Sequence, residues 1–202
     1  MGTTANKIGL YGGTFDPVHN GHINIALTSF KQLGLDEVWF LIEEKPRNKI
    51  VATSYYHREK MLELALKMYP NLVASNAITK NLGKTHDINS LFVLLENSPK
   101  VDFTLIAGID TLQNLDKWQD YSKFISLIDF AIAPRPRFPA SAINNLISRL
   151  GENAQNFKFT ILDMPFSDAS SSEARNSIKV QKTTNFLDEN VLNYISAHKL
   201  YR

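Results

Sequence analysis

The chain has 202 residues, a length that suits one compact domain. Hydrophobic residues make up 44% of it and charged residues 21%, a balance that excludes a disordered or a fibrous chain. The formal net charge of +2 argues against a dedicated nucleic-acid-binding protein, because phosphate contacts need a concentrated basic face. The sequence contains no cysteine, which excludes disulfides, thiolate zinc sites and cysteine nucleophiles.

The apolar runs of the chain are short. The polar segment Met1–Lys7 leads only into the apolar run Ile8–Tyr11, which is too short for a secretory signal. The densest later run, Leu91–Leu95, is far below the roughly 20 residues that span a bilayer. We therefore expect a cytoplasmic protein that has no membrane partner.

Runs of β-branched and aromatic residues alternate along the chain with helical patterns. The predicted strands are nearly continuous in their apolar character, as expected for strands covered on both faces; they are Lys7–Tyr11, Glu37–Ile42, Leu72–Ser75, Phe103–Ala107, Asp129–Ala133 and Lys158–Leu162. The predicted helices are Gly21–Leu33, Tyr55–Met68, Asn89–Glu96, Tyr121–Ile128, Ala140–Leu150, Ser171–Val180 and Asp188–His198, the last with Asp188 as its N-cap. This alternation predicts an α/β fold with a parallel sheet, in which ligands bind outside the carboxyl ends of the strands.

The segment Pro134–Pro139 interrupts this pattern with three prolines in six residues, and it is predicted to be a loop leaving the fifth strand. The part of the chain after it is too short to fold alone. We therefore interpret residues 1–202 as a single domain, with a sheet-and-helix core at 6–165 and C-terminal helices at 166–202.

The sharpest motif is Gly12–His22, with the sequence GGTFDPVHNGH, directly after the first predicted strand. Two glycines at the end of a strand let the backbone turn and bring N–H groups close to an anion. The helix that follows directs its positive N-terminus to the same place. His19 and His22 are three residues apart and can face one side of its first turn. Two imidazoles over a cradle of amides suit a polyphosphate whose charge grows during group transfer.

Other interpretations of these residues are available. Gly-Gly after a strand is also typical of a plain turn. Two histidines at this spacing are also typical of a pair on the protein surface. A zinc site at His19 and His22 would need a further ligand, with Asp16 the nearest, in a chain without cysteine or an HExxH helix. The tripeptide Gly83–Thr85 ends like a P-loop, but Ile78 stands where that motif needs glycine. The ordered run at a strand–helix junction favours a phosphate site, and we expect no metal ligands.

A second motif, Ser170–Arg175 with the sequence SSSEAR, opens a late helix. Serines at a helix N-terminus leave first-turn N–H groups for an anion or accept from them, and Arg175 lies one turn on, where its guanidinium could grip a phosphate. The alternative is a plain capping box, with Ser170 or Ser171 as the cap, Glu173 near the third position and a solvated arginine.

Together the two motifs resemble a known signature. A GGTFDPxHxGH run followed late in the chain by SS[ST]xxR is typical of the nucleotidyltransferase superfamily, and within it the chain most resembles bacterial nicotinate-nucleotide adenylyltransferases. The resemblance runs nearly end to end. It also includes Leu35–Phe40, Lys49, His57, Arg58, Gly108–Asp110 with Leu115 and Trp118, and Arg135–Pro136.

This resemblance implies a single domain with a Rossmann-like, doubly wound parallel sheet. It also implies transfer of AMP from ATP to nicotinate mononucleotide, with Mg²⁺ as cofactor and deamido-NAD and pyrophosphate as products. His19, His22 and Arg175 would be catalytic, and ATP would be bound by Gly12, Gly13, Thr14, Phe15, Gly108, Asp110, Ser171 and Ser172. The pyridine mononucleotide would be bound by Lys49, Thr85, His86, Asp87, Trp118 and Arg135.

The chemistry read from the residues agrees with this reaction. The phosphate of a mononucleotide is already an anion at neutral pH, so its attack on ATP needs positioning and charge neutralisation rather than a strong base. The motifs supply imidazoles, amides and an arginine, with no obvious catalytic carboxylate dyad. They therefore favour direct in-line displacement without a covalent intermediate.

Two departures from the family pattern concern the acceptor. The family's PPHK becomes PRNK at Pro46–Lys49, where Asn48 replaces the histidine. The family's GxSYTFDT-like stretch becomes GKTHDINS at Gly83–Ser90, with His86 for tyrosine and Asp87 for threonine. An acidic Asp87 beside the nicotinate carboxylate is unfavourable because like charges repel, unless it only caps the helix that begins there.

These departures leave rival functions open. Nicotinamide mononucleotide, which lacks the carboxylate, is an alternative acceptor, and a cytidylyltransferase or another acceptor in the same superfamily is a second alternative. A nucleotide-binding module without turnover is a third, and a homo-oligomer is left open. Among single residues, Trp118 either lines the acceptor pocket or fills the core, Arg58 pairs with nearby acids, and His198 lies at the surface.

Overall fold

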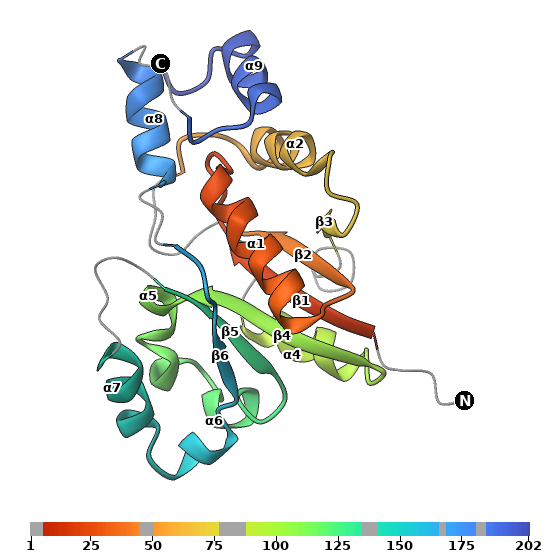
Figure 1. Ribbon diagram of the computed structural model, residues 1–202, viewed down its shortest axis with the longest axis vertical. Coiled ribbons are helices and arrows are strands. Elements are labelled where there is room, and N and C mark those ends of the chain that lie inside the picture. Colours follow the sequence, from red (N-terminus) through yellow and green to blue (C-terminus); the bar gives the residue numbers. More distant parts are fainter. Residues whose placement is uncertain (1–5, 45–50, 77–87, 135–140, 166–168, 181–184) are drawn as a thin grey trace.

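The computed structural model describes residues 6–44, 51–76, 88–134, 141–165, 169–180 and 185–202. In this part of the chain a parallel sheet forms from β1 (Asn6–Gly13), β2 (Glu37–Ile42), β3 (Leu72–Ala74), β4 (Val101–Gly108), β5 (Asp129–Ala133) and β6 (Phe159–Ile161) (Figure 1). The strand order is β3-β2-β1-β4-β5-β6, and every pair is parallel. This is the doubly wound Rossmann-like order, whose direction reverses between β1 and β4.

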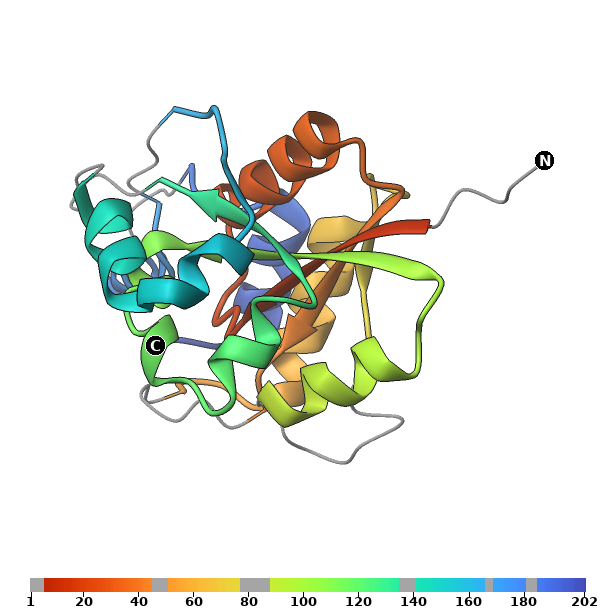
Figure 2. The same ribbon diagram turned by 90° about the horizontal axis from the view of Figure 1, so that it is seen from below.

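The described helices are α1 (Asn20–Leu33), α2 (Tyr55–Leu66), α4 (Ile88–Glu96), α5 (Ile109–Leu112), α6 (Tyr121–Phe124), α7 (Ser141–Leu150), α8 (Ser171–Lys179) and α9 (Glu189–Ala197). Short 3-10 helices lie at Leu115–Lys117 and Gly151–Asn156. Helices α1 and α4 lie on opposite faces of the sheet, so the sheet is the middle layer (Figure 2). None of the described helices is long and apolar enough to cross a membrane.

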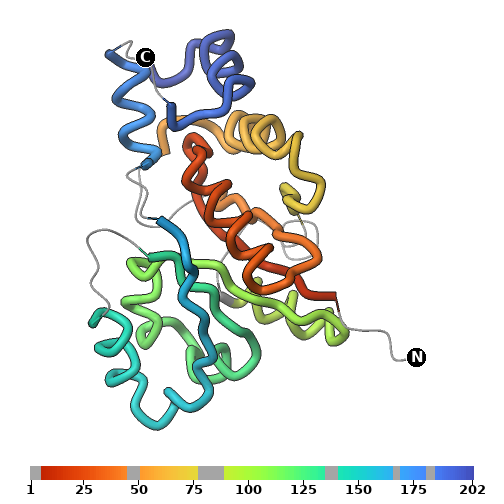
Figure 3. Tube along the Cα trace, viewed as in Figure 1, coloured from red at the N-terminus to blue at the C-terminus, as the bar shows by residue number. Residues whose placement is uncertain are grey.

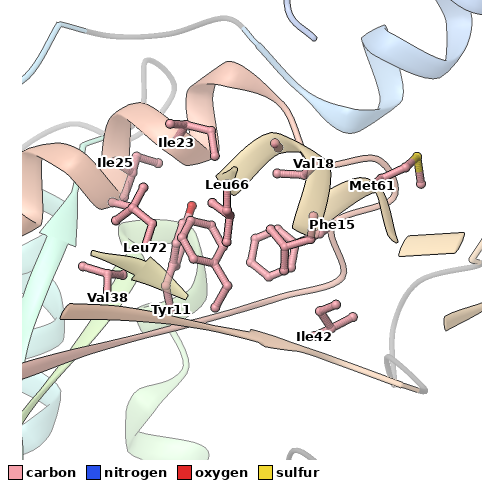
Figure 4. Packing of buried hydrophobic residues seen from close by; sticks show 14 of the residues in the cluster. Tyr11, Phe15, Val18, Ile23, Ile25, Val38, Ile42, Met61, Leu66 and Leu72 are labelled. Carbon is pink, nitrogen blue, oxygen red and sulfur yellow. The ribbon is translucent and has the colours of Figure 1, made fainter. Parts of the chain in front are cut away.

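Strand alternation divides the apolar side chains between two cores. Tyr11 faces the core shared with α1, α2, α8 and α9 (Figure 4), and Phe40 belongs to the same core. Leu10 and Leu41 face the core shared with α4 to α7. Because neighbouring residues of a strand point to opposite faces, a strand covered on both sides needs apolar residues at consecutive positions. This arrangement explains the near-continuous apolar runs of the sequence.

The last helices return to the beginning of the first one (Figure 3). The backbone N–H of Asn20 donates to the carbonyl of Phe186 at 2.7 Å, and the Asn20 amide donates to the carbonyl of Asn185 at 3.0 Å. Apolar residues of α9 are buried against α2 in the same core. The C-terminal segment therefore closes over the end of the sheet at which β1 gives way to α1.

The predicted elements agree with the structure, with local corrections. Asp188 caps α9, as predicted, because its carboxylate accepts from the N–H of Asn190 at 2.8 Å. The helix predicted at Tyr121–Ile128 is wrong beyond Phe124, where the chain continues in tighter i→i+3 turns. There the Ser126 hydroxyl donates to the carbonyl of Lys123 at 2.7 Å and competes with helical bonding. Helix α5 was not predicted, since four residues are too few to show a helical period.

Candidate active site

Strand β1 carries the glycines of the first motif at its carboxyl end. Contrary to the sequence prediction of a turn, Gly12 and Gly13 continue the strand and pair in register with Leu41 and Ile42 of β2. The turn falls later, at Phe15, whose φ of 48° lies in the left-handed region. The prediction was wrong because it took conformational freedom as the reason for both glycines.

The space around them explains better why these two positions are glycines. A Cβ at Gly13 would lie 2.9 Å from the Phe15 ring, closer than real Cβ contacts come. A Cβ at Gly12 would meet no protein atom within 4 Å, because this exposed position opens away from the sheet. Gly13 therefore lets Phe15 fold back into the core, and Gly12 leaves the strand end bare for a ligand to approach.

His19 and His22 lie together at the start of α1, as their spacing predicted. Their rings are stacked with centroids 3.6 Å apart and planes 27° apart. His19 is the N-cap residue and is buried, and its backbone N–H donates to Nδ1 of His22 at 3.2 Å. The pair therefore stands at the positive end of a 14-residue helix that begins beside the carboxyl end of β1.

Gly21 makes this stacking possible. A Cβ at Gly21 would lie 3.0 Å from both Cε1 and Nδ1 of the His19 ring and 3.3 Å from the Cβ of Ala169. The glycine of the HxGH motif therefore provides the space that the His19 imidazole occupies above the first helical turn.

Helix α8 brings the second motif against the first. The Ser171 hydroxyl donates to the Pro17 carbonyl at 2.9 Å, and Nη1 of Arg175 donates to the Asp16 carbonyl at 2.6 Å. Nη2 of Arg175 lies 3.2 Å from the Ser172 hydroxyl. The two motifs, more than 150 residues apart in sequence, thus meet at Asp16 and Pro17, which are joined by a cis peptide bond.

The capping alternative for this motif is also present in the structure. Ser170 is the N-cap of α8, its hydroxyl accepts from the Glu173 N–H at 3.1 Å, and it donates to the Glu173 carboxylate at 3.1 Å. The arginine, however, is half-buried and bonded rather than solvated. One serine therefore caps the helix, while Ser171 and Arg175 connect it to the first motif.

Asp16 is buried inside the first motif, 2% exposed. One carboxylate oxygen accepts from the Tyr201 hydroxyl at 2.7 Å, and the other accepts from the Ala52 N–H at 2.6 Å. The described residues bring no three His, Cys, Asp or Glu side chains together in a geometry that could hold a metal ion. Both carboxylate oxygens of Asp16 are thus engaged in hydrogen bonds within the protein.

Arg58 has a structural role, and the prediction that it pairs with nearby acids is wrong. Instead of pairing with acids, its guanidinium donates to the carbonyls of Thr14 at 2.7 Å, Glu43 at 2.7 Å and Glu44 at 3.0 Å. It is 1% exposed, and burial lowers the pKa of the guanidinium. Arg58 thereby ties the backbone after β1 to the backbone after β2. Its place in the apolar stripe of α2, three residues before Met61, was the signal that could have identified it.

The predicted ribose-binding residues lie at the end of the neighbouring strand. Gly108 ends β4 and is the N-cap of α5, and Asp110 is exposed in the first turn of that helix. Because β1 and β4 are adjacent at the reversal of strand order, Gly12–His22 and Gly108–Asp110 follow the carboxyl ends of neighbouring strands, where sheets of this kind bind ligands. Trp118 is half-buried against the opposite core, with its ring 6.1 Å from that of Phe124.

Other predicted residues have different placements. His57 bonds through Nδ1 to the Tyr194 hydroxyl at 2.9 Å, and His198 is exposed, as expected. Five residues expected to contact the acceptor lie outside the described residues: Lys49, Thr85, His86, Asp87 and Arg135. Their roles stay predictions.

Comparison with known proteins agrees with this geometry. The sequence profile of the cytidylyltransferase-like family matches residues 10–177. The chain is 34% identical to the "probable nicotinate-nucleotide adenylyltransferase" of Streptococcus mutans serotype c, over 97% of this chain and 89% of that protein. It is 30% identical to the nicotinate-nucleotide adenylyltransferase of Bacillus subtilis, over 96% of this chain and 98% of that protein.

A solved structure shares the fold. The Plasmodium falciparum nicotinic acid mononucleotide adenylyltransferase complexed with NaAD superposes with a TM-score of 0.78 at 20% identity, over 97% of both chains. The profile match covers most of the chain, and the sequence relatives are matched over almost their whole length. This chain therefore belongs to the cytidylyltransferase-like nucleotidyltransferases and, within them, to the nicotinate-nucleotide adenylyltransferase family.

Proposed function

We propose that the protein transfers the adenylyl group of ATP to nicotinate mononucleotide and releases pyrophosphate. A phosphate oxygen of the mononucleotide forms a bond to the α-phosphorus of ATP, and the bond from that phosphorus to the oxygen bridging to the β-phosphate breaks. The products are deamido-NAD and pyrophosphate, so the reaction belongs to NAD biosynthesis. Family membership supports this reaction, and the cytoplasm is the compartment that we expect for it.

One observation carries the proposal: α8 brings Arg175 onto the motif that holds the stacked histidines. Arg175 donates to the Asp16 carbonyl, three residues before His19, at 2.6 Å. A guanidinium has several N–H donors in a fixed fork, so Arg175 can keep this anchor and still donate to a phosphate. The Arg175 guanidinium and the two imidazoles thereby gather from two helices near the bare end of β1.

Each group has a role in an in-line displacement. His19 and His22 stabilise the charge that grows on the transferring α-phosphate, and backbone amides from Gly12 to Phe15 hold the phosphates of ATP. Arg175 stabilises the departing pyrophosphate, with Ser171 and Ser172 beside it. Gly108 and Asp110 meet the adenosine ribose at the end of β4.

Magnesium enters this reaction as part of the substrate, Mg·ATP. Mg²⁺ keeps several waters and binds readily to phosphate oxygens, with at most one or two carboxylates. When bound, the ion supplies neutralisation of phosphate charge, and the protein supplies position.

The decisive experiment measures pyrophosphate release from Mg·ATP with nicotinate mononucleotide and, separately, with nicotinamide mononucleotide. We expect a clear preference for the nicotinate form, and His19→Ala serves as the low-activity control. A preference for the amide form would instead mean that His86 and Asp87 have changed the acceptor site, and H86Y/D87T would then be expected to shift preference back. Absence of release with both acceptors would contradict the proposal.

A further inference from the structure

The penultimate residue of the chain is built into the first motif. The Tyr201 hydroxyl donates to Asp16 across 185 positions of sequence, at 2.7 Å, and both side chains are buried. The tyrosine ring packs in the core shared with α1 and α2, and its oxygen lies 3.9 Å from the sulfur of Met61. A buried hydrogen bond to a carboxylate is stronger than a neutral one and is costly to leave unmade.

The backbone after α9 adopts an unfavourable conformation on the way to Tyr201. The N–H groups of Lys199 and Leu200 return to the carbonyls of Ser196 and Ile195, which closes the helix in a Schellman-type turn. Lys199 has a φ of 53° and Tyr201 a φ of 62°, a region in which residues with a Cβ are disfavoured. Such conformations persist where surrounding contacts hold them, and for Tyr201 the Asp16 bond is such a contact.

Asp16 links this chain end to the reacting groups. Its carboxylate is held by Tyr201 on one oxygen and by the Ala52 N–H on the other, while its carbonyl accepts from Arg175. The same residue thus has its side chain fixed by the C-terminal turn and its main chain bonded to the guanidinium. A change at the carboxylate therefore moves the point at which Arg175 is anchored.

Tyr201 remains a hydrogen-bond donor over the working pH range. Burial, together with the nearby Asp16 carboxylate, raises the pKa of the Tyr201 hydroxyl above its ordinary value. Its proton is consequently retained where a solvated tyrosine would begin to lose it, and the bond to Asp16 persists.

We propose that Tyr201 is a positioning residue for the transfer reaction, which fixes Asp16 and, through the Asp16 carbonyl, sets where the Arg175 guanidinium meets the triphosphate. Tyr201 itself touches no reacting atom. This inference rests on the proposed function and adds to it a part for the end of the chain.

The test is a double-mutant cycle of Tyr201→Phe and Arg175→Ala. Phenylalanine keeps the ring in the core and removes only the hydroxyl. Two quantities are measured for each variant: the dissociation constant of Mg·ATP without acceptor, by calorimetry, and kcat with nicotinate mononucleotide. Tyr194→Phe is the matched control, because it removes another C-terminal tyrosine hydroxyl, bonded to His57 rather than to the motif.

We expect Tyr201→Phe to weaken Mg·ATP binding several-fold and to lower kcat about tenfold, with the KM for the mononucleotide within twofold of wild type. In the Arg175→Ala background the same change should have less than a twofold effect on each quantity. Tyr194→Phe should leave both quantities near their wild-type values, because its hydroxyl bonds to His57 away from the motif.

The inference is overturned if Tyr201→Phe acts by the same factor with and without Arg175, or if it has no effect on either quantity. A wild-type protein that binds Mg·ATP but fails to turn over nicotinate mononucleotide would contradict the proposed function instead. The binding cycle would still decide the role of Tyr201 in that case, so the two failures are distinguishable.

Discussion

The imidazole rings of His19 and His22 stack 3.6 Å apart, centroid to centroid, at the first turn of α1. One ring belongs to the N-cap residue and the other to the third residue of the helix, and Gly21 between them leaves room for the His19 ring. The pair is thus held by local geometry before any ligand arrives, which is the preorganisation that a developing charge on phosphate requires.

Removing the first imidazole should therefore impair the chemical step. His19→Ala is expected to lower kcat at least about a hundredfold, the scale measured when a preorganised stabilising group is lost. The change is to be measured by pyrophosphate release at saturating substrates, with thermal unfolding as the check on folding. Activity equal to that of the wild type would refute the role assigned to His19.

Filling the space at Gly21 should have a similar effect through geometry alone. Gly21→Ala adds a Cβ 3.0 Å from the His19 ring, so the ring must move from its stacked position. We expect kcat to fall about tenfold or more, while helix propensity itself improves. Asn24→Ala, at an exposed position of the same helix, is the control and should keep wild-type kcat. Equal kcat values for the two variants would show that stacking is not needed.

Replacing Arg58 should destabilise the fold. Arg58→Met removes the donor to three backbone carbonyls, and an unsatisfied buried polar group costs roughly 1–3 kcal/mol. We expect the free energy of unfolding to drop by about 3 kcal/mol or more in urea titrations. Lys60→Ala on the same helix breaks only an exposed pair with Glu63 and should change the free energy of unfolding far less. Comparable losses of stability in both variants would contradict the structural role assigned to the Arg58 hydrogen bonds.

The Tyr201 hydroxyl predicts a dependence of stability on alkaline pH. Burial and the Asp16 carboxylate raise its pKa in the folded state, whereas in the unfolded chain it titrates at about 10. Above that pH the unfolded state binds fewer protons than the folded state, so the free energy of unfolding falls as pH rises, by up to about 1.4 kcal/mol per pH unit. Below it the contribution is fully present.

Tyr201→Phe isolates this effect from the other titrating groups. Urea titrations of wild type and variant between pH 9 and pH 11 should show the steeper loss of stability in the wild type. Parallel curves for the two proteins would mean that the hydroxyl titrates as an ordinary tyrosine.

Local sequence patterns were sufficient to predict the order and type of the main elements and the placement of the first motif at a strand–helix junction. Consecutive apolar positions identified the strands of a sheet covered on both faces, and the HxGH spacing placed His19 and His22 on one helical turn. These features depend on residues close together in the chain, so local periodicity and capping preferences are sufficient to reveal them.

The second motif already indicated Arg175 as a site residue, but the contacts that join distant residues around Asp16 emerge only from the packed fold. Arg175 and Tyr201 meet Asp16 across 159 and 185 positions of sequence, and Arg58 reaches the carbonyl of Thr14 across 44. Such contacts leave no periodic trace, since they depend on how the strand order and the return of the C-terminal helices bring separate segments together. The role of the glycines could not be predicted from the local sequence either. Gly13 and Gly21 make space for the rings of Phe15 and His19, and those rings take their positions only in the packed fold.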